Sequence, residues 1–499
     1  MSDTKVLPQH DLPAGGFEHP PAATALSSNE KIDAFGDNGS DSEKGGAVAV
    51  LTADGAVFEE LASAESGHDI KFRTLSWKRA GILLATEYVC LAISSFAWSF
   101  SVMGFAGGVI FSIGYGLVTW YTSYVLWQYC LLHPEARDLV DIGYLLFGKS
   151  SIAMQLTLLG LVLNNLFIVG LHTLTGSKIL NTLSDHATCS VVFSVVTMVV
   201  GIVLTLPRTL RGLTTMGIAS AICMFIGLLL CIIFAGTESN PAYGYGGLYP
   251  KLGASVVVEA AAPAGSTWIA VMNAILNITY TYVGQALLPS FIAEMERPQD
   301  FPKALTLSML LEIVLFTGFG IFGYAFTGQY ATAPLFGSLQ NPGKKISFGF
   351  VIVPTLIIGV IYASTIAKVF YLRILGNSDA RHSHSAKGWS VWIGCVIVTW
   401  VLGWIVGECI PFFGDLLSIM SSLFDSFFGM MFWSIAYFRI NRGRAFSSIK
   451  YIVLSVINVL IFIGGLVMLG PGTYTSVIAI IADFAGPTKH PFSCADNSL

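Results

Sequence analysis

Eleven long apolar segments constrain the fold of this chain more than any other feature of its sequence. A helix needs about 20 mostly apolar residues to cross the hydrocarbon core of a bilayer, and each segment is of that order. Only 11% of the 499 residues are charged, whereas a soluble domain carries about 25% charged residues. We therefore expect an all-α membrane protein with about eleven transmembrane helices. The segments are residues 80–103, 107–131, 153–178, 189–207, 213–236, 267–290, 304–327, 348–371, 389–408, 412–436 and 449–470.

The first 76 residues differ sharply from the rest of the chain. They are rich in Gly, Ser, Ala and acidic residues, and they carry 13 acids against five bases. A segment of this composition has too little apolar surface to form a core. The sequence thus predicts a disordered acidic tail at 1–76, a transmembrane domain at 77–470 and a short external tail at 471–499.

The positions of Lys and Arg predict the orientation in the membrane. With the N-terminus in the cytoplasm, the inner segments hold 21 of the 26 bases. Cytoplasmic loops are enriched in Lys and Arg, so the N-terminal tail is expected inside. An odd number of spans then places the C-terminus outside. Cys189 and Cys409 both fall near predicted outer ends, where they could form a disulfide.

The sixth segment, 267–290, is apolar at its start but polar at its centre. Backbone groups inside a bilayer have no water to bond, so an irregular stretch is tolerated only where it lines a cavity. Broken helices of this kind mark the binding sites of transporters. The alternative is an ordinary helix whose hydroxyls bond to its own carbonyl groups. The polar stretch consists of Thr279, Tyr280, Thr281, Tyr282, Gly284 and Gln285, and Pro289 follows it.

Three stretches carry a family resemblance. FIAEMERPQDFPKAL at 291–305 resembles the acidic, proline-punctuated sequence after the sixth span of amino acid/auxin permeases. TLSWKRAGILLATEYVCLAISSFAWSFSVMG at 74–104 resembles the first span of the fungal members, and DLVDIGYLLFGKS at 138–150 resembles their second cytoplasmic loop. Over roughly residues 70–470 the chain is thus similar to this family, in particular to fungal neutral amino acid permeases. The resemblance implies the amino acid–polyamine–organocation superfamily fold, a five-plus-five inverted repeat with discontinuous spans 1 and 6, and proton-coupled amino acid uptake.

In such a repeat the first span is the counterpart of the sixth. It has a matching polar stretch, but Ala97 stands where relatives usually have a proline, so an unbroken Ser-rich helix is the alternative. If both helices break, their free N–H groups can bind the carboxylate of an amino acid. In the third span, Asn165 and His172 share one helical face at membrane depth; hydrogen bonds that only hold helices together are the alternative. The predicted substrate-binding residues are Ser95, Trp98, Ser99, Asn165, Tyr280, Thr281, Gly284 and Gln285.

Proton coupling requires a second set of residues. Glu87, Glu312 and Asp425 are acids inside predicted spans, where a buried charge is costly unless it is protonated, paired or facing water. Glu87 lies seven residues before Ser94 and so on the same face; a structural pair with a base near the inner surface is its alternative role. The superfamily resemblance adds two hydroxyls of the eighth span, which could instead bond to the preceding turn. The predicted coupling residues are Glu87, Ser364, Thr365 and Asp425.

These patterns favour a secondary active transporter that imports neutral amino acids, aliphatic or aromatic, across the plasma membrane. Alternatives are a vacuolar or endosomal amino acid exporter and a receptor that keeps the fold without transporting. The sequence contains no nucleotide-binding loop, HExxH, GxSxG or Cys/His metal cluster, so an enzyme is not expected. The expected partners are a neutral amino acid, a proton and the lipid bilayer, without a cofactor, a metal or nucleic acid.

Overall fold

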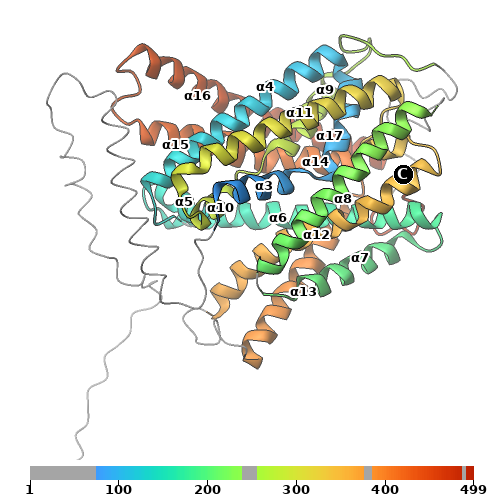
Figure 1. Cartoon of the computed structure of the whole chain (residues 1–499), viewed down its shortest axis with the longest axis horizontal. Helices are drawn as coiled ribbons and strands as arrows, with labels where there is room; N and C mark the ends of the chain where they lie inside the picture. The colour runs from blue at the N-terminus through green and yellow to red at the C-terminus, as the bar shows by residue number, and fades with distance from the viewer. Residues whose placement is uncertain are drawn as a thin grey trace, which may run out of the picture. The chain divides into compact units, whose positions relative to one another are not determined.

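The computed structural model describes residues 75–136, 138–208, 210–238, 255–375, 385–485 and 490–498 (Figure 1). They belong to one compact unit, Asp54–Leu499. The predicted tail, apart from its last two residues, lies outside the described residues, as do residues 239–254 between the fifth and sixth predicted segments. The described residues form helices and no β-strand, which confirms the all-α fold.

Helix is present in every predicted segment. Eight helices in the described part of the chain are long and apolar enough to cross a membrane, judged by length and composition; the count of eleven stays a prediction. The helices are α3 (Trp77–Tyr88), η2 (Leu91–Ser95), α4 (Phe96–Leu132), α5 (Leu139–Leu146), α6 (Ser151–Ser184), α7 (Ser190–Thr205), α8 (Leu210–Thr237), α9 (Trp268–Tyr282), α10 (Leu288–Glu294), η3 (Pro298–Asp300), α11 (Phe301–Thr327), η4 (Gly328–Tyr330), η5 (Leu335–Ser338), α12 (Gly343–Leu375), α13 (Ala386–Cys409), α14 (Phe413–Met420), the π-helix η7 (Ser421–Met431), α15 (Phe432–Ile440), α16 (Ile449–Val467), the π-helix η8 (Met468–Gly472) and α17 (Thr473–Phe484).

The first predicted span is discontinuous, although not where its serines lie. Helix α3 ends at Tyr88, Val89 and Cys90 are not helical, and η2 then begins. The polar stretch that we expected to form the break is helical instead. Its hydroxyls bond to the preceding turn: Ser94 donates to the Leu91 carbonyl at 2.6 Å and Ser101 to the Trp98 carbonyl at 2.8 Å. The helix therefore breaks one to two turns nearer the N-terminus than the serines indicated.

The boundary between the first two predicted spans is a kink inside α4. Gly104 has φ +74°, and a Cβ there would overlap the backbone of Ala261. An L-residue with a side chain is strained at this φ, so glycine is required on both counts. The chain kinks at Gly104 and is helical on both sides of it.

The sixth span breaks at the end of the predicted polar stretch, at Gly284 and Gln285, whereas Thr279 and Thr281 are still helical and donate to the Ile275 and Asn277 carbonyls. Thr267 caps α9 by accepting a hydrogen bond from the Ala270 N–H at 3.2 Å. Helix α9 ends at Tyr282, residues 283–287 are not helical, and α10 resumes with Pro289 in its first turn. Proline fits there because the N–H groups in the first turn of a helix have no intrahelical acceptor, so the N–H that proline lacks is not missed. Both discontinuous spans are thus confirmed.

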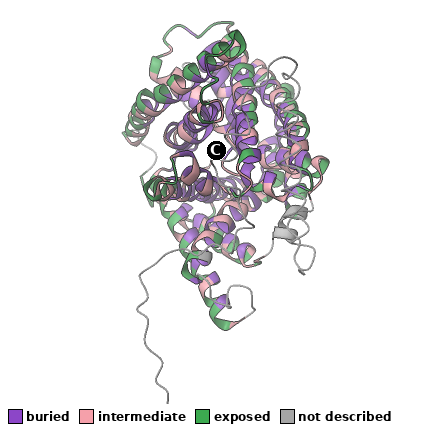
Figure 2. Ribbon diagram, turned by 90° about the vertical axis from the view of Figure 1, so that its left-hand side faces the viewer, coloured by how far each residue is buried: buried purple, intermediate pink, exposed green. Residues whose placement is uncertain are grey.

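Two sets of helices surround the breaks. Helix α4 packs against α11 and α9, whereas α6 packs against α13 and α12. Buried residues lie inside the bundle and exposed ones face outwards (Figure 2). Many exposed side chains are large and apolar, such as Ile110, Leu159 and Val314. An outer surface of this kind suits contact with lipid.

Two expectations for the C-terminal region need revision, the partner of Cys189 and the end of the last helix. Cys189 is bonded to Cys494, not to Cys409, which is a free thiol. The sequence argument missed Cys494 because it lies outside the apolar segments. Helix continues through η8 and α17 to Phe484, beyond the boundary predicted at 470.

Candidate functional site

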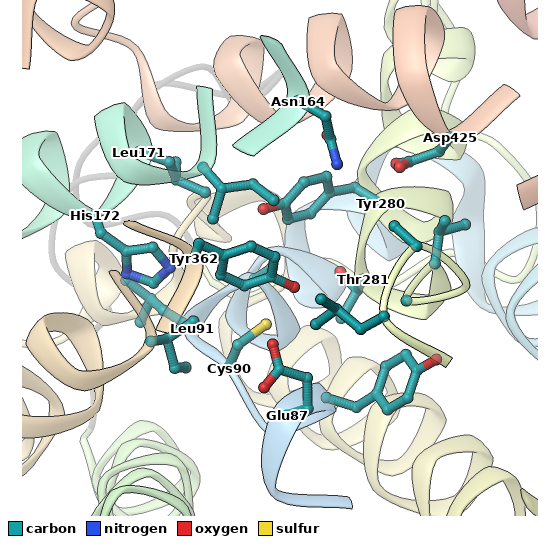
Figure 3. Close-up of a pocket in the computed structure, with 18 of the residues that line it drawn as sticks. Glu87, Cys90, Leu91, Asn164, Leu171, His172, Tyr280, Thr281, Tyr362 and Asp425 are labelled. Atoms are coloured by element: carbon teal, nitrogen blue, oxygen red, sulfur yellow. The ribbon is translucent and has the colours of Figure 1, made fainter. Parts of the chain in front are cut away.

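A cavity of about 60 Å³ lies between the two helix breaks (Figure 3). Its walls come from α3 and the residues after it, from α6, from α9 and the residues after it, from α12, and from the tenth predicted segment. A cavity needs about 15 Å³ to admit a water molecule, so this one is large enough to hold water. The structure thus brings both interrupted helices to one small internal space, as broken spans require.

The sixth-span break presents free backbone donors at the cavity. Within the described chain, the N–H groups of Gly284, Gln285 and Ala286 donate no hydrogen bond to another protein group. Gly284 and Ala286 line the cavity. Both residues are half-buried, so their unpaired N–H groups can bond to water or to another acceptor in the cavity. A carboxylate is such an acceptor.

Glu87 occupies one side of the cavity. The hydroxyl of Tyr362, from α12, points toward its carboxyl group and hydrogen-bonds to it (Figure 3). One carboxyl oxygen, Oε1, is buried without a partner in the described chain. The structural pair with a base, which was the alternative for Glu87, is not found among the described residues.

Asp425 and Asn164 lie on another side of the cavity, with Tyr280 near both (Figure 3). Asp425 is in the π-helix η7; π-helical turns occur frequently at functional sites. Asp425 Oδ2 and Asn164 Oδ1 are buried without partners in the described chain. His172 also lines the cavity, and its ring donates a hydrogen bond to the Thr355 carbonyl. Among the described residues that line the cavity there is no Lys or Arg.

Five of the predicted site residues line this cavity, and seven do not. Those at the cavity are Glu87, Tyr280, Thr281, Gly284 and Asp425. Those elsewhere are Ser95, Trp98, Ser99, Asn165, Gln285, Ser364 and Thr365.

The residues elsewhere have other surroundings. Ser364 and Thr365 both donate to the Ile361 carbonyl, at 2.8 and 2.9 Å, which is the alternative raised for them. Ser95 likewise donates to the Ala92 carbonyl at 2.7 Å, and Trp98 packs against the hydrophobic core.

The remaining three are buried polar residues. Gln285 donates to the Thr122 hydroxyl of α4 at 3.1 Å. Ser99 and Asn165 are buried, and their side-chain polar atoms have no partner in the described chain. Asn165 is thus next to the cavity residue Asn164 in sequence but turned to another side of α6.

Sequence reasoning missed several cavity residues, including Tyr88, Tyr362, Phe413 and Phe428. Tyr88 follows Glu87 directly and could have been found by placing the break earlier. Tyr362 lies two residues before Ser364, but nothing in an apolar span marks which tyrosine faces a ligand. Phe413 and Phe428 look like ordinary apolar span residues.

The cytoplasmic ends predicted for the two broken spans are joined in the structure. Leu75, just before α3, pairs with Met295, just after α10, in a β-bridge. The Leu75 N–H donates to the Glu294 carbonyl at 3.1 Å, and the Glu296 N–H donates to the Leu75 carbonyl at 3.0 Å. Trp127 Nε1 donates to the Pro298 carbonyl at 2.8 Å. Burial raises the pKa of the Glu294 carboxyl, and the positive charge of Lys368 acts in the opposite direction. The charged exit of the sixth span is therefore fixed to the start of the first.

An all-α, multi-pass chain with two broken helices around one internal cavity is the architecture of a membrane transporter. The model of the transmembrane amino acid transporter family matches residues 73–478. The chain belongs to this family.

Known proteins of several organisms are similar along most of their length. The chain is 32% identical over 445 residues to the N amino acid transport system protein of Neurospora crassa, covering 88% of this chain and 92% of that protein. It is 28% identical over 483 residues to a transmembrane transporter of Gibberella moniliformis, covering 95% and 97%. It is 21% identical over 386 residues to the amino acid transporter AVT1B of Arabidopsis thaliana, covering 75% and 66%. All three are named as transport proteins.

Proposed function

We propose that this protein imports neutral amino acids together with protons, by alternating access, across the plasma membrane, with its N-terminal tail in the cytoplasm. The observation that carries the proposal is the cavity between the two helix breaks, which is lined by Gly284 and Ala286 with their unpaired N–H groups and by the carboxyl groups of Glu87 and Asp425. The Neurospora protein, named for amino acid transport, supports the substrate class.

The two ends of an amino acid suit different parts of the cavity. The carboxylate is placed at the free N–H groups of the sixth-span break, where charge-assisted hydrogen bonds are strong. The side chain is placed against Tyr280, Phe413 and Phe428, whose rings give an apolar surface. No lysine or arginine among the described cavity residues would pair with an acidic side chain, which favours neutral substrates.

The coupling proton is assigned to the carboxyl groups that face the cavity, Glu87 and Asp425. A buried carboxylate without a basic partner is costly, so binding a proton stabilises it in place. Because these acids share the cavity with the substrate, loading one affects the energy of loading the other.

Radiolabelled amino acid uptake in a permease-deficient host tests the proposal. Uptake of neutral amino acids is expected to rise as the external pH falls, and a protonophore should abolish accumulation. Dependence on sodium without any response to pH would refute proton coupling. A tagged protein that stains vacuoles would favour the organellar exporter. Absence of flux, with partners bound through the tail, would favour the receptor.

A further inference from the structure

A second group of buried polar side chains adjoins the cavity at Tyr88. It consists of Tyr88 at the end of α3, Thr119 and Ser123 on α4, Gln285 in the sixth-span break, and Glu312 on α11, and is called the Glu312 cluster below. Tyr88 belongs both to this cluster and to the lining of the cavity. The role of Glu312 is not accounted for by the proposed binding site.

Packing and hydrogen bonds bring these residues together. Gln285 Nε2 donates to Thr122, and Thr119 and Ser123 share that face of α4 at helical spacing. A Cβ on Gly284 would lie 2.5 Å from the Tyr88 hydroxyl, so this hydroxyl lies against the break next to Gln285. Tyr88 and Tyr282 both interact electrostatically with Glu312. Helix α11 packs along both α3 and α4.

Each member of the cluster has a polar atom without a partner. Within the described chain, these buried atoms are Tyr88 Oη, Thr119 Oγ1, Ser123 Oγ, Gln285 Oε1 and Glu312 Oε2. The other oxygen of Glu312 accepts a hydrogen bond from Ser308, one turn before it. More than nine in ten buried polar groups are paired in folded proteins, so five unpaired atoms on elements that pack together indicate water or an ion.

The electrostatic surroundings of Glu312 favour a proton over a fixed ion pair. Its side chain is fully buried, and no Lys, Arg or His in the described chain pairs with it. The titratable groups that interact with it are Tyr88 on α3 and Tyr282 on α9, while α4 contributes the hydroxyls of Thr119 and Ser123. None of these supplies a positive charge, so the carboxylate form is uncompensated.

We propose that Glu312 is a relay for the coupling proton, which water in the Glu312 cluster passes between Glu312 and the carboxyl groups of the cavity by way of Tyr88. The proton comes from water, adds to Glu312 Oε2 to form a neutral carboxylic acid, and returns to water on the other side; no other reactant is needed. This inference rests on the proposed proton-coupled uptake. It adds to that function a site that does not touch the substrate.

A hydrogen-bonded path extends the cluster along the interface of α4 and α11. Ser112 of α4 bonds to the Tyr282 hydroxyl at 3.1 Å and to the Thr317 hydroxyl of α11 at 2.7 Å. Thr317 lies five residues after Glu312 on the same helix. Hydroxyl groups both donate and accept, so such a row can pass a proton between waters. Glu312 interacts electrostatically with Tyr282, so this row of hydroxyls begins beside it.

Purified protein in liposomes gives a direct test, with the membrane potential clamped at zero and an inward proton gradient imposed. For one proton per amino acid, the wild type should accumulate substrate about tenfold for each unit of pH difference. The Glu312→Gln variant should keep exchange of labelled for unlabelled amino acid but accumulate none, a ratio near one at every pH. Glu135→Gln, the same change at an exposed acid, should behave as the wild type.

The outcomes separate this inference from the proposed function. Gradient-driven accumulation that survives in Glu312→Gln would overturn the Glu312 assignment and leave proton coupling intact. A wild type that exchanges amino acids without responding to the gradient would defeat proton coupling itself. If Glu312→Gln fails to fold, Tyr88→Phe keeps the ring and removes only the linking hydroxyl. It should lower the rate of gradient-driven uptake more than the rate of exchange, and equal effects on both rates would count against the path.

Discussion

Three glycines set the distance between α6 and α13, and replacing one of them should separate the two helices. A Cβ on Gly170 would lie 2.7 Å from the Gly403 carbonyl oxygen and 2.9 Å from the Gly407 nitrogen. Ordinary van der Waals contacts of a Cβ are 3.4–4 Å, so an alanine here is about 0.7 Å short of an ordinary contact. Gly403 and Gly407 have the small-xxx-small spacing that lets membrane helices approach closely.

The cost of Gly170→Ala follows from what blocks the new methyl group. Both blocking atoms belong to the backbone, so no side chain can rotate out of the way. Overpacking typically costs about 1–3 kcal/mol, and a rigid contact belongs at the upper end. About 3 kcal/mol corresponds to roughly a 100-fold change in the folding equilibrium. The shift would also displace His172, two residues further along α6 in the cavity wall, so transport should fall as well.

Thermal unfolding in detergent, followed by the loss of the monodisperse protein peak, measures this effect. Gly394→Ala is the matched control, because a Cβ on this α13 glycine meets no atom within 4 Å. Alanine is favoured over glycine in a helix by about 1 kcal/mol, so Gly394→Ala should melt at or above the wild-type temperature. Gly170→Ala should melt several degrees lower. Equal melting temperatures for the two variants would refute the argument from close helix approach.

Three further predictions concern the site, the disulfide and the topology. Gly284→Val should weaken uptake of all amino acids roughly 10- to 150-fold, since the new side chain displaces Tyr88 and disturbs the N–H groups placed at the carboxylate. Tyr280→Ala should instead change the ranking among substrates. Unchanged affinity in surface-expressed Gly284→Val would show that the site lies elsewhere. Cys494→Ser should free the segment 490–498 from Cys189 and lower the melting temperature, as should a reducing agent on the wild type, and a reductant effect that persists in the variant would point to another cause. Protease added to intact cells should remove a C-terminal tag and spare an N-terminal one, and the reverse pattern would overturn the orientation.

The apolar segments made most of the fold predictable from the sequence. Inside a membrane, the backbone N–H and C=O groups of a run of about 20 apolar residues can be hydrogen-bonded in few ways. Each segment therefore forms a helix. The sixth-span break was also predictable, because Gly284 and Pro289 interrupt the apolar helix; the hydroxyls of Thr279 and Thr281 bond to their own helix and so did not mark it. The first-span break was harder. Its site, at Val89 and Cys90, contains neither Gly nor Pro, so tertiary packing and not local preference determines it.

The candidate site was predicted less completely, for a physical reason. Helical spacing tells which residues share a face, but not which face turns to the cavity. Asn164 and Asn165 differ by about 100° around α6, and only Asn164 reaches the cavity. Serine and threonine are more ambiguous still, because their hydroxyls can bond to their own helix, as Ser95, Ser364 and Thr365 do.

Tyr88 connects these features into one mechanism. It ends α3 at the first break, its hydroxyl lies against Gly284 in the second break, and it interacts with Glu312 on α11. An amino acid whose carboxylate pulls the N–H groups of residues 284–286 inwards would move the wall against which Tyr88 rests. A proton on Glu312 removes a negative charge beside the same tyrosine. Each event thus alters the surroundings of a side chain that the other event also contacts, and linkage then requires the two to influence each other equally. Glu312 would then contribute to coupling without contacting the substrate, through one tyrosine that both sites share.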